Sequence, residues 1–347
     1  MATPPEPRAN PALVGHDEAT RTMAEAARSR RLHHAWLLSG PMGLGKATLA
    51  YRFARWMLAG QPDGAAPASA APLFVSEDDP VFRRVAAGAH ADLFTLAPST
   101  GEKGKKEVLR AEEARAAVRF MAHTAAEGGW RVVVVEDLER AEREVVPNIL
   151  LKTLEEPPPR TVLLLVSAQP DRLLPTIRSR CRRLDLFPLP APEMEGLLAS
   201  WLPDTRTADR AALARIADGC PGRALVLAEG EGLAMQAAVE EVFAGLPRLD
   251  ARLLHSVADK VAGQRDPAAL PLFMFLLRRG LSAALRQAAR AGGAATPWVS
   301  ARPLAEWSAL WDRLGRLAEE TERLNLDRKQ ALLSGLAMLR PAAESRR

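Results

Sequence analysis

Residues 35–48, AWLLSGPMGLGKAT, decide the fold of this 347-residue chain. An apolar run at Ala35 to Ser39 leads through a glycine-rich loop into a helical pattern at Lys46 to Leu58. A strand, a glycine loop and a helix in this order cradle phosphates, because backbone N–H groups and the helix N-terminus face the anion while a lysine reaches its outer oxygens. The candidate nucleotide-binding residues in the loop are Gly40, Gly43, Gly45 and Lys46.

From residue 35 to about residue 189, short apolar runs alternate with longer amphipathic stretches. This alternation predicts an α/β fold, in which a parallel sheet is covered by helices. The five predicted strands are Ala35 to Ser39, Asp92 to Leu96, Val132 to Val135, Thr161 to Val166 and Arg183 to Leu186. The predicted helices between them are Lys46 to Leu58, Val108 to Thr124, Val145 to Leu154 and Asp171 to Ser179.

The strand pattern ends at a linker in which Pro188, Pro190 and Pro192 forbid a helix. Helical spacing follows, and the chain is too long for one ordinary domain. We therefore predict three domains: an α/β domain at residues 1–189, a small helical domain at 190–246 and an all-helical domain at 247–347. Helices are predicted in the last of these at Asp250 to Ala262, Leu270 to Ala291 and Pro303 to Leu339.

Composition sets several classes of protein aside. Hydrophobic residues make up 48% of the chain, but no apolar run approaches the roughly 20 residues of a membrane-spanning helix. The net charge of +5 permits contact with nucleic acid without requiring it. Two cysteines are too few for a four-thiolate zinc site, and the N-terminus has no apolar export signal. We expect a globular protein of the cytoplasm.

The residue after the loop lysine departs from the phosphate-loop pattern. A serine or threonine there ligates Mg²⁺ through its hydroxyl, but this chain has Ala47. The next hydroxyl, on Thr48, lies about 100° further round the helix and is poorly placed to substitute. Two interpretations stay open: a working ATP site, or a loop that keeps the fold and binds nucleotide weakly or not at all. The second is favoured.

A second nucleotide element is expected where an apolar strand ends in an acid. Residues 132–137, VVVVED, provide such an element, and Asp137 is placed to hold Mg²⁺ through water. The alternative is a buried strand that ends in a polar turn.

Two further runs carry a family resemblance. Residues 150–158, LLKTLEEPP, and residues 174–181, LPTIRSRC, together with the phosphate loop, resemble the clamp-loader branch of the AAA+ ATPases over residues 12–190. The resemblance implies an AAA+ P-loop domain with a five-stranded parallel sheet, a helical lid domain and a C-terminal helical collar for oligomerisation. It also implies the partners of the chain, which are the tau/gamma motor subunits and the delta subunit. The sliding clamp and primer-template DNA would be reached through the complex, and no membrane is involved.

Departures from the active family members concern hydrolysis. Active members place Asp and then Glu at the second nucleotide element, and the Glu orients the attacking water. Asp137 matches the Asp, so the Glu position is Leu138, which cannot polarise water. Glu136 lies one residue early and points to the other face of a strand. Arg223 lies about one residue late for the family's sensor arginine. With Ala47, these departures resemble the non-hydrolysing subunit type.

Arg180 lies in the Ser-Arg-Cys run and is the one candidate catalytic residue. The resemblance implies that it acts in trans as an arginine finger on a partner's ATP, which suits a planar guanidinium that is always charged. The alternative is a solvated basic turn, since Arg178, Arg182 and Arg183 lie close by. Residues 62–91, where many relatives carry a zinc-binding insertion, contain no cysteine, so no zinc and no other metal ligand is expected.

We expect a non-hydrolysing structural subunit of a pentameric clamp loader that uses ATP to place the sliding clamp on primed DNA. The main alternative is a motor-type AAA+ ATPase that itself uses Lys46, Thr48 and Asp137. A small-molecule kinase is a weaker alternative, because the helical tail offers no polar cluster for an acceptor site. No run resembles a polymerase active site, so DNA synthesis would belong to the holoenzyme and not to this chain.

Overall fold

The computed structural model describes residues 6–60, 72–99, 108–127, 129–142, 144–264, 269–290 and 298–343. The chain divides into two compact units, with the division along the sequence between Arg223 and Ala224. The first unit contains the sheet and the second is helical. The division into three domains, with boundaries near residues 189 and 246, stays a prediction.

The first unit is built on one parallel sheet with the strand order β2-β3-β4-β1-β5. Its strands are β1 (Ala35–Ser39), β2 (Leu93–Leu96), β3 (Arg131–Val135), β4 (Thr161–Ser167) and β5 (Arg182–Asp185). All four pairings between neighbouring strands are parallel. The predicted α/β class and the five parallel strands are confirmed, and each strand boundary lies within one residue of its prediction.

Burial explains why the central strands could be recognised from the sequence. Every residue of β1, β3 and β4 is buried, because helices cover both faces of a parallel sheet. Strand β5 lies at the edge and carries exposed charges at Arg182, Arg183 and Asp185, a composition that keeps an edge strand from pairing with another chain.

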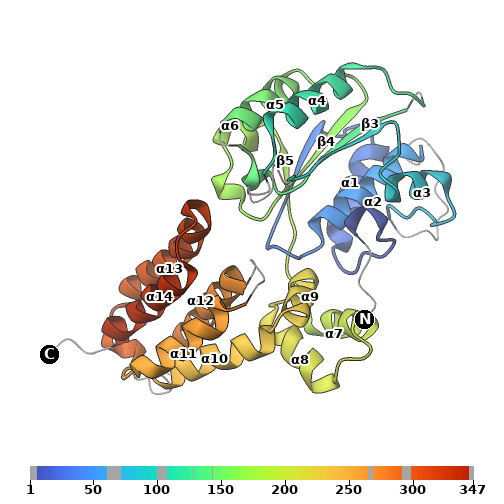
Figure 1. Cartoon of the computed structure of the whole chain (residues 1–347). Coiled ribbons are helices and arrows are strands. Elements are labelled where there is room, and N and C mark those ends of the chain that lie inside the picture. Colours follow the sequence, from blue (N-terminus) through green and yellow to red (C-terminus); the bar gives the residue numbers. More distant parts are fainter. Residues whose placement is uncertain are drawn as a thin grey trace. The chain divides into compact units, whose positions relative to one another are not determined.

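Helices cover the sheet on both faces (Figure 1). Those that pack with one core are α1 (Asp17–Arg28), α2 (Lys46–Leu58) and α3 (Pro80–Ala86), and those of the other core are α4 (Ala111–Ala122), α5 (Val145–Glu155) and α6 (Pro175–Arg178). Alternate residues of each strand serve the two cores: Trp36 belongs to the first core and Leu37 to the second. Two small helices follow the sheet, α7 (Ala191–Trp201) and α8 (Thr207–Ile216).

Two predicted helices of this unit need correction. The structure has no single helix from Asp171 to Ser179, because α6 begins only at Pro175. Proline favours the first helical position and forces the preceding residue, here Leu174, out of the helical region. The helix predicted from Val108 begins at Ala111, since the two residues at 108 and 109 form isolated bridges.

The second unit consists of helices that pack against one another. They are α9 (Pro221–Glu229), which starts in the first unit, α10 (Gly232–Ala244), α11 (Ala251–Ala262), α12 (Ala269–Arg290), α13 (Leu304–Leu324) and α14 (Arg328–Ala343). The single stretch predicted from Pro303 to Leu339 is two helices, because Asn325 adopts a left-handed conformation with φ of 50° and ends α13. Trp298 and Trp307 pack edge to face in the core, with ring centroids 5.2 Å apart.

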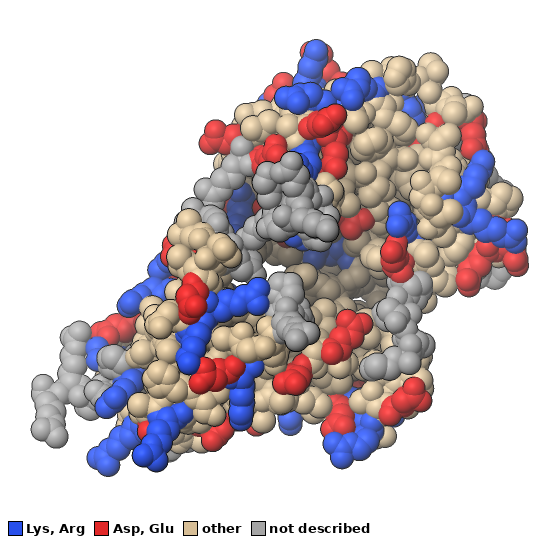
Figure 2. Space-filling model, in the orientation of Figure 1, with Lys and Arg blue, Asp and Glu red and all other residues tan. Residues whose placement is uncertain are grey.

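Surface charge is mixed. On the face drawn in Figure 2, Lys and Arg side chains lie among Asp and Glu side chains, as the small net charge of +5 leads us to expect. Among the described residues, no helix combines the length and the apolar character that a bilayer crossing needs.

A pair of valine substitutions tests the sheet core. Val133→Ala removes two methyl groups from a residue with no exposed surface, and we expect a loss of about 2 kcal/mol in the free energy of unfolding. Val145 is 44% exposed in the first turn of α5, so Val145→Ala should change stability little, because alanine also favours the helix. Urea unfolding of both variants measures the difference. Equal losses would contradict the placement of Val133 in the core.

Candidate functional site

The phosphate loop joins β1 to α2, as predicted. Gly45 is the N-cap of α2 with φ of 95°, so the loop turns directly onto the helix N-terminus. Gly43 has φ of 78°, and a Cβ atom there would lie 2.5 Å from the backbone nitrogen of Arg223. Only glycine fits this position, both for its left-handed backbone and for its contact with the turn at residues 219–223.

Lys46 is engaged by its own loop. Its Nζ donates hydrogen bonds to the carbonyl oxygens of Gly40 at 2.8 Å and Pro41 at 2.7 Å, and the residue is only 5% exposed. Burial lowers the pKa of Lys46, while the neighbouring carboxylates of Glu139 and Asp137 raise it. The lysine that would reach the outer phosphates of a nucleotide is therefore satisfied by backbone carbonyls within the loop.

Two other segments close on the same loop. The backbone N–H of Gly222 donates to the Gly43 carbonyl at 2.8 Å, and a Cβ atom on Gly222 would lie 2.9 Å from the Gly43 Cα. The Nε2 of His16 lies 2.9 Å from the Leu44 carbonyl, which can only accept, so this nitrogen carries the proton. The loop is thus held by contacts from the N-cap of α1 and from the first turn of α9.

The two residues that follow Lys46 differ in their side chains. Ala47 offers no oxygen, and Thr48 is 8% exposed among the buried residues of α2. The loop therefore presents no exposed hydroxyl at the start of α2, where an Mg²⁺ ligand would be needed.

The acidic end of β3 is not arranged for hydrolysis. Asp137 follows the strand in a left-handed conformation with φ of 46°, and its Oδ2 lies 3.9 Å from a guanidinium nitrogen of Arg140. Leu138, at the position where an active ATPase has its water-orienting Glu, is 2% exposed and belongs to the core under α4 and α5. A leucine buried there can neither accept a proton nor orient water.

Glu136 is already used by a buried tyrosine. The Tyr51 hydroxyl donates to its Oε1 at 2.6 Å and lies 3.1 Å from the Thr95 hydroxyl. Burial raises the pKa of Glu136, although the hydrogen bond from Tyr51 opposes this shift. Glu136 therefore faces α2 and does not take the place of the missing catalytic Glu.

Sequence reasoning missed Glu139. Its Oε1 accepts the backbone N–H of Ala168 at 2.9 Å, at the end of β4, and its charge is the strongest influence that raises the Lys46 pKa. The short 3₁₀ turn at Leu138–Arg140 brings this carboxylate back to the carboxyl edge of the sheet. In the sequence, the only signal for Glu139 was its position two residues after Asp137. The 3₁₀ turn that brings it to the sheet could not be predicted from the strand pattern.

Arg180 lies away from the phosphate loop. Strands β1 and β5 are parallel, with Trp36 opposite Arg182 and Ser39 opposite Asp185. The loop follows the carboxyl end of β1, whereas Arg180 precedes the amino end of β5. Because the two strands are parallel, the loop and Arg180 lie at opposite ends of the strands. At about 3.3 Å per residue, the paired strands alone separate them by roughly 10 Å. The structure does not bring Arg180 together with Gly40, Lys46 or Asp137, which meet at the carboxyl edge.

The surroundings of Arg180 are polar and partly open. Its side chain is 36% exposed, and it pairs with Glu155 at 2.7 Å. The next residue, Cys181, is different: burial raises its pKa to about 12, so its thiol is not a nucleophile near neutral pH.

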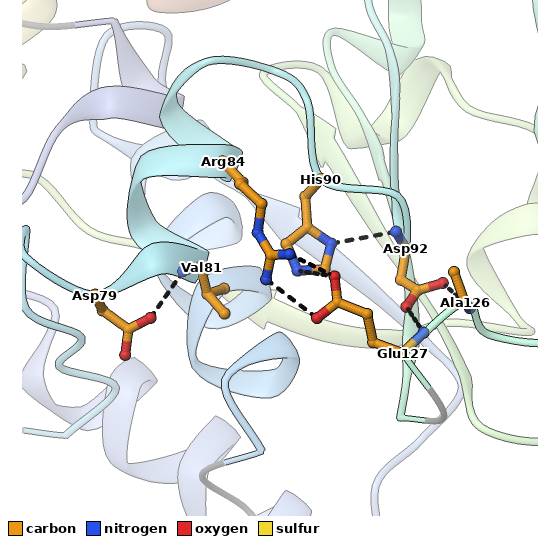
Figure 3. Close-up of polar contacts among 7 residues, drawn as sticks. All are labelled: Asp79, Val81, Arg84, His90, Asp92, Ala126 and Glu127. Carbon is orange, nitrogen blue, oxygen red and sulfur yellow. Dashed lines mark hydrogen bonds and ion pairs between the residues drawn. The ribbon is translucent and has the colours of Figure 1, made fainter.

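A second polar cluster lies between α3 and β2, and it is structural (Figure 3). Arg84 forms two hydrogen bonds with Glu127, at 2.8 and 3.1 Å, and Asp92 accepts the backbone N–H groups of Ala126 and Glu127. His90 is 4% exposed and accepts the Asp92 N–H through Nδ1. Burial lowers the pKa of His90. Within the described parts of the chain, no group of three or more His, Cys, Asp and Glu side chains could hold a metal ion.

Taken together, the sheet and the loop define a P-loop α/β protein. The family model described as "DNA polymerase III, delta subunit" matches residues 15–190. The chain therefore belongs to this family.

Relatives point the same way. DNA polymerase III subunit delta' of Pseudomonas aeruginosa is 39% identical over 218 residues, which cover 62% of this chain and 61% of the relative. Subunit delta' of Escherichia coli is 36% identical over 58% of this chain and 56% of the relative. Subunit tau of Salmonella typhimurium is 27% identical over 78% of this chain and 40% of the relative. The chain thus spans less than two thirds of the length of these proteins.

The resemblance found in the sequence is confirmed by these matches. The non-hydrolysing subunit type that the departures favoured corresponds, in our prediction, to delta-prime, and the family match with the two delta' relatives supports this assignment. By homology, the chain is related to the delta' and tau subunits of DNA polymerase III.

The partly buried Glu136 predicts a pH dependence of stability. Its pKa is raised in the folded state above the ordinary value of 4.5, so the folded state holds the proton to higher pH than the unfolded state. Its contribution to stability is therefore present below pH 4.5 and is lost as pH rises through the folded-state pKa. Glu136→Gln keeps an acceptor for Tyr51 and removes the charge.

Urea unfolding of the wild type and of Glu136→Gln, from pH 4 upward, measures this difference. We expect the stability of the wild type to fall relative to the variant as pH rises. A constant difference between the two proteins at every pH would contradict the raised pKa of Glu136 in the folded state.

Proposed function

We propose that this chain is a non-hydrolysing, delta-prime-like subunit of the DNA polymerase III clamp loader. It supplies Arg180 in trans to ATP bound by a neighbouring tau/gamma motor subunit. Delta is a further partner, and the sliding clamp and primer-template DNA are reached through the complex. The chain also contributes a rigid subunit to the ATP-dependent loading of the clamp in replication. Its location is the cytoplasm.

The observation that carries this proposal is the burial of Leu138. The position of the water-orienting Glu lies inside the core with 2% exposure, so a change of side-chain rotamer cannot restore the catalytic group. The absent hydroxyl at Ala47 removes a metal ligand independently. Binding of nucleotide at Gly40, Gly43, Gly45, Lys46, Thr48 and Asp137 is accordingly weak or lost, and the role requires no cofactor.

The place of Arg180 supports action on another molecule. It lies at the edge of the sheet opposite the chain's own phosphate loop, and its guanidinium is partly open. A guanidinium offers a planar set of donors that stays charged, which is suited to the charge that builds up on a transferred phosphoryl group. Its own loop is too distant to receive it, so a neighbouring subunit's ATP is the fitting target.

Substitution of Arg180 tests the proposal. In a loader assembled with motor and delta subunits, Arg180→Ala should slow clamp- and DNA-stimulated ATP hydrolysis by a factor of roughly 10³, the loss typical of an arginine finger. Arg178→Ala is the matched control, because the Arg178 side chain has the same 36% exposure and is paired with Asp171. Steady-state hydrolysis by the purified complexes gives both values.

Two outcomes would overturn the proposal. If the Arg180→Ala loader hydrolyses ATP at the same rate as the Arg178→Ala loader, Arg180 is not an arginine finger. Slower hydrolysis in a loader that carries Lys46→Ala in this chain, with assembly intact, would favour the motor-type alternative, in which this chain's own site turns over ATP.

A further inference from the structure

One ion pair joins the two family motifs that the sequence presents separately. Glu155 lies in the run LLKTLEEPP, and Arg180 lies 25 residues later in the run LPTIRSRC. In the structure, a terminal guanidinium nitrogen of Arg180 lies 2.7 Å from Glu155 Oε1. The other terminal nitrogen donates to the carbonyl oxygen of Thr176 at 3.1 Å, within α6. Both ends of the guanidinium are therefore tied to fixed elements of the sheet domain.

The position of Glu155 is unfavourable for α5 itself. It is the last residue of that helix, and a carboxylate there meets the negative end of the helix dipole. Glu156 follows immediately as the C-cap and adds a second negative charge. The positive charge of Arg180 compensates the negative charge of Glu155. The presence of an acid at this position is therefore better explained by its pairing with Arg180 than by any benefit to the helix.

The backbone that carries Glu155 is anchored. The Nε2 of His34 lies 2.9 Å from the Leu154 carbonyl, which can only accept, so the histidine donates to the end of α5. Leu154 itself is 2% exposed in the core. The carboxylate of Glu155 thus extends from a fixed point, although its side chain is 50% exposed.

The pair leaves donors available on Arg180. A guanidinium has N–H groups on three nitrogens, and Glu155 and Thr176 each engage one terminal nitrogen. The contact with the carboxylate is through one oxygen. The nitrogen that donates to Thr176 also donates to the Ser179 hydroxyl at 3.5 Å, so Nε–H and the second N–H of the nitrogen paired with Glu155 remain for a phosphate. An exposed pair of this kind adds little to folding stability, but it removes rotamer freedom that docking would otherwise have to restrict.

We propose that Glu155 is a positioning residue, which orients the Arg180 guanidinium for the ATP of a neighbouring subunit. This inference rests on the proposed function of Arg180 and adds a second residue to it. Glu155 does not touch the nucleotide. It holds the arginine in place before the subunits meet, and a small misplacement of a catalytic group lowers the rate strongly.

Loaders assembled with variants of this chain test the inference by ATP hydrolysis. Glu155→Gln should slow clamp- and DNA-stimulated hydrolysis about tenfold, within the roughly 10² that misplacement can cost. Glu156→Gln is the matched control, since it removes the same charge one residue further along, and it should leave the rate unchanged. In the Arg180→Ala background, Glu155→Gln should have no further effect, because a positioning residue acts only through the residue that it positions.

Further measurements separate positioning from a general structural role. Thermal unfolding of Glu155→Gln and its assembly on size exclusion should match those of Glu156→Gln. Glu155→Asp keeps the charge but shortens the reach by one methylene group, and it should also slow hydrolysis. This second variant keeps the inference testable if the Gln variant does not assemble.

The possible results are distinguishable. If Arg180→Ala leaves hydrolysis unchanged, the proposed function fails and the inference fails with it. If Arg180→Ala slows hydrolysis but Glu155→Gln behaves like Glu156→Gln, only the inference is overturned. Faster hydrolysis by Glu155→Gln, or an equal loss from Glu155→Gln with and without Arg180, would also overturn it.

Discussion

The parallel pairing of β1 with β5 is the constraint on which the functional account depends. It fixes the phosphate loop at one edge of the sheet and Arg180 at the other, with Trp36 opposite Arg182 in the register. No movement of a side chain can bring Arg180 to the chain's own loop, because the paired strands lie between them. In the role that we propose for it, an arginine held there acts on the ATP of a neighbouring subunit.

The chain's own loop is held by contacts within the protein. Lys46 donates to two loop carbonyls, and the Gly222 N–H binds the carbonyl of Gly43. Leu138 fills the core where a hydrolytic subunit needs an acid. Such a loop still serves the fold, since it connects the inner strand β1 to α2, which packs on the sheet. The proposed loss of hydrolysis and the retention of the loop are therefore compatible.

Much of this fold could be predicted from the sequence, and the reasons lie in particular elements. Strands such as Thr161–Ser167 are buried on both faces, so they read as continuous apolar runs between turns. Helix α1 was not predicted, although its apolar residues recur at helical spacing: its buried face is mostly alanine, and the rest of the helix is charged or polar. The break between α13 and α14 was missed because a single residue, Asn325, turns the chain.

The candidate site was only partly accessible from the sequence, for a different reason. Ala47 and Leu138 depart from a motif, so their positions could be read directly along the chain. Glu139 and the pair of Glu155 with Arg180 depend on turns and on contacts between residues far apart in the sequence. Spacing alone cannot show such contacts, because the loops that join the elements set the distances.

ATP turnover by the isolated chain is the most direct measurement of the central claim, with Lys46→Ala as the control. The account predicts no hydrolysis above that of the Lys46→Ala variant at any ATP concentration, because Ala47 and Leu138 leave the site without a metal hydroxyl or an acid that orients water. Turnover that disappears in the Lys46→Ala variant would contradict it and would make this chain a motor in its own right.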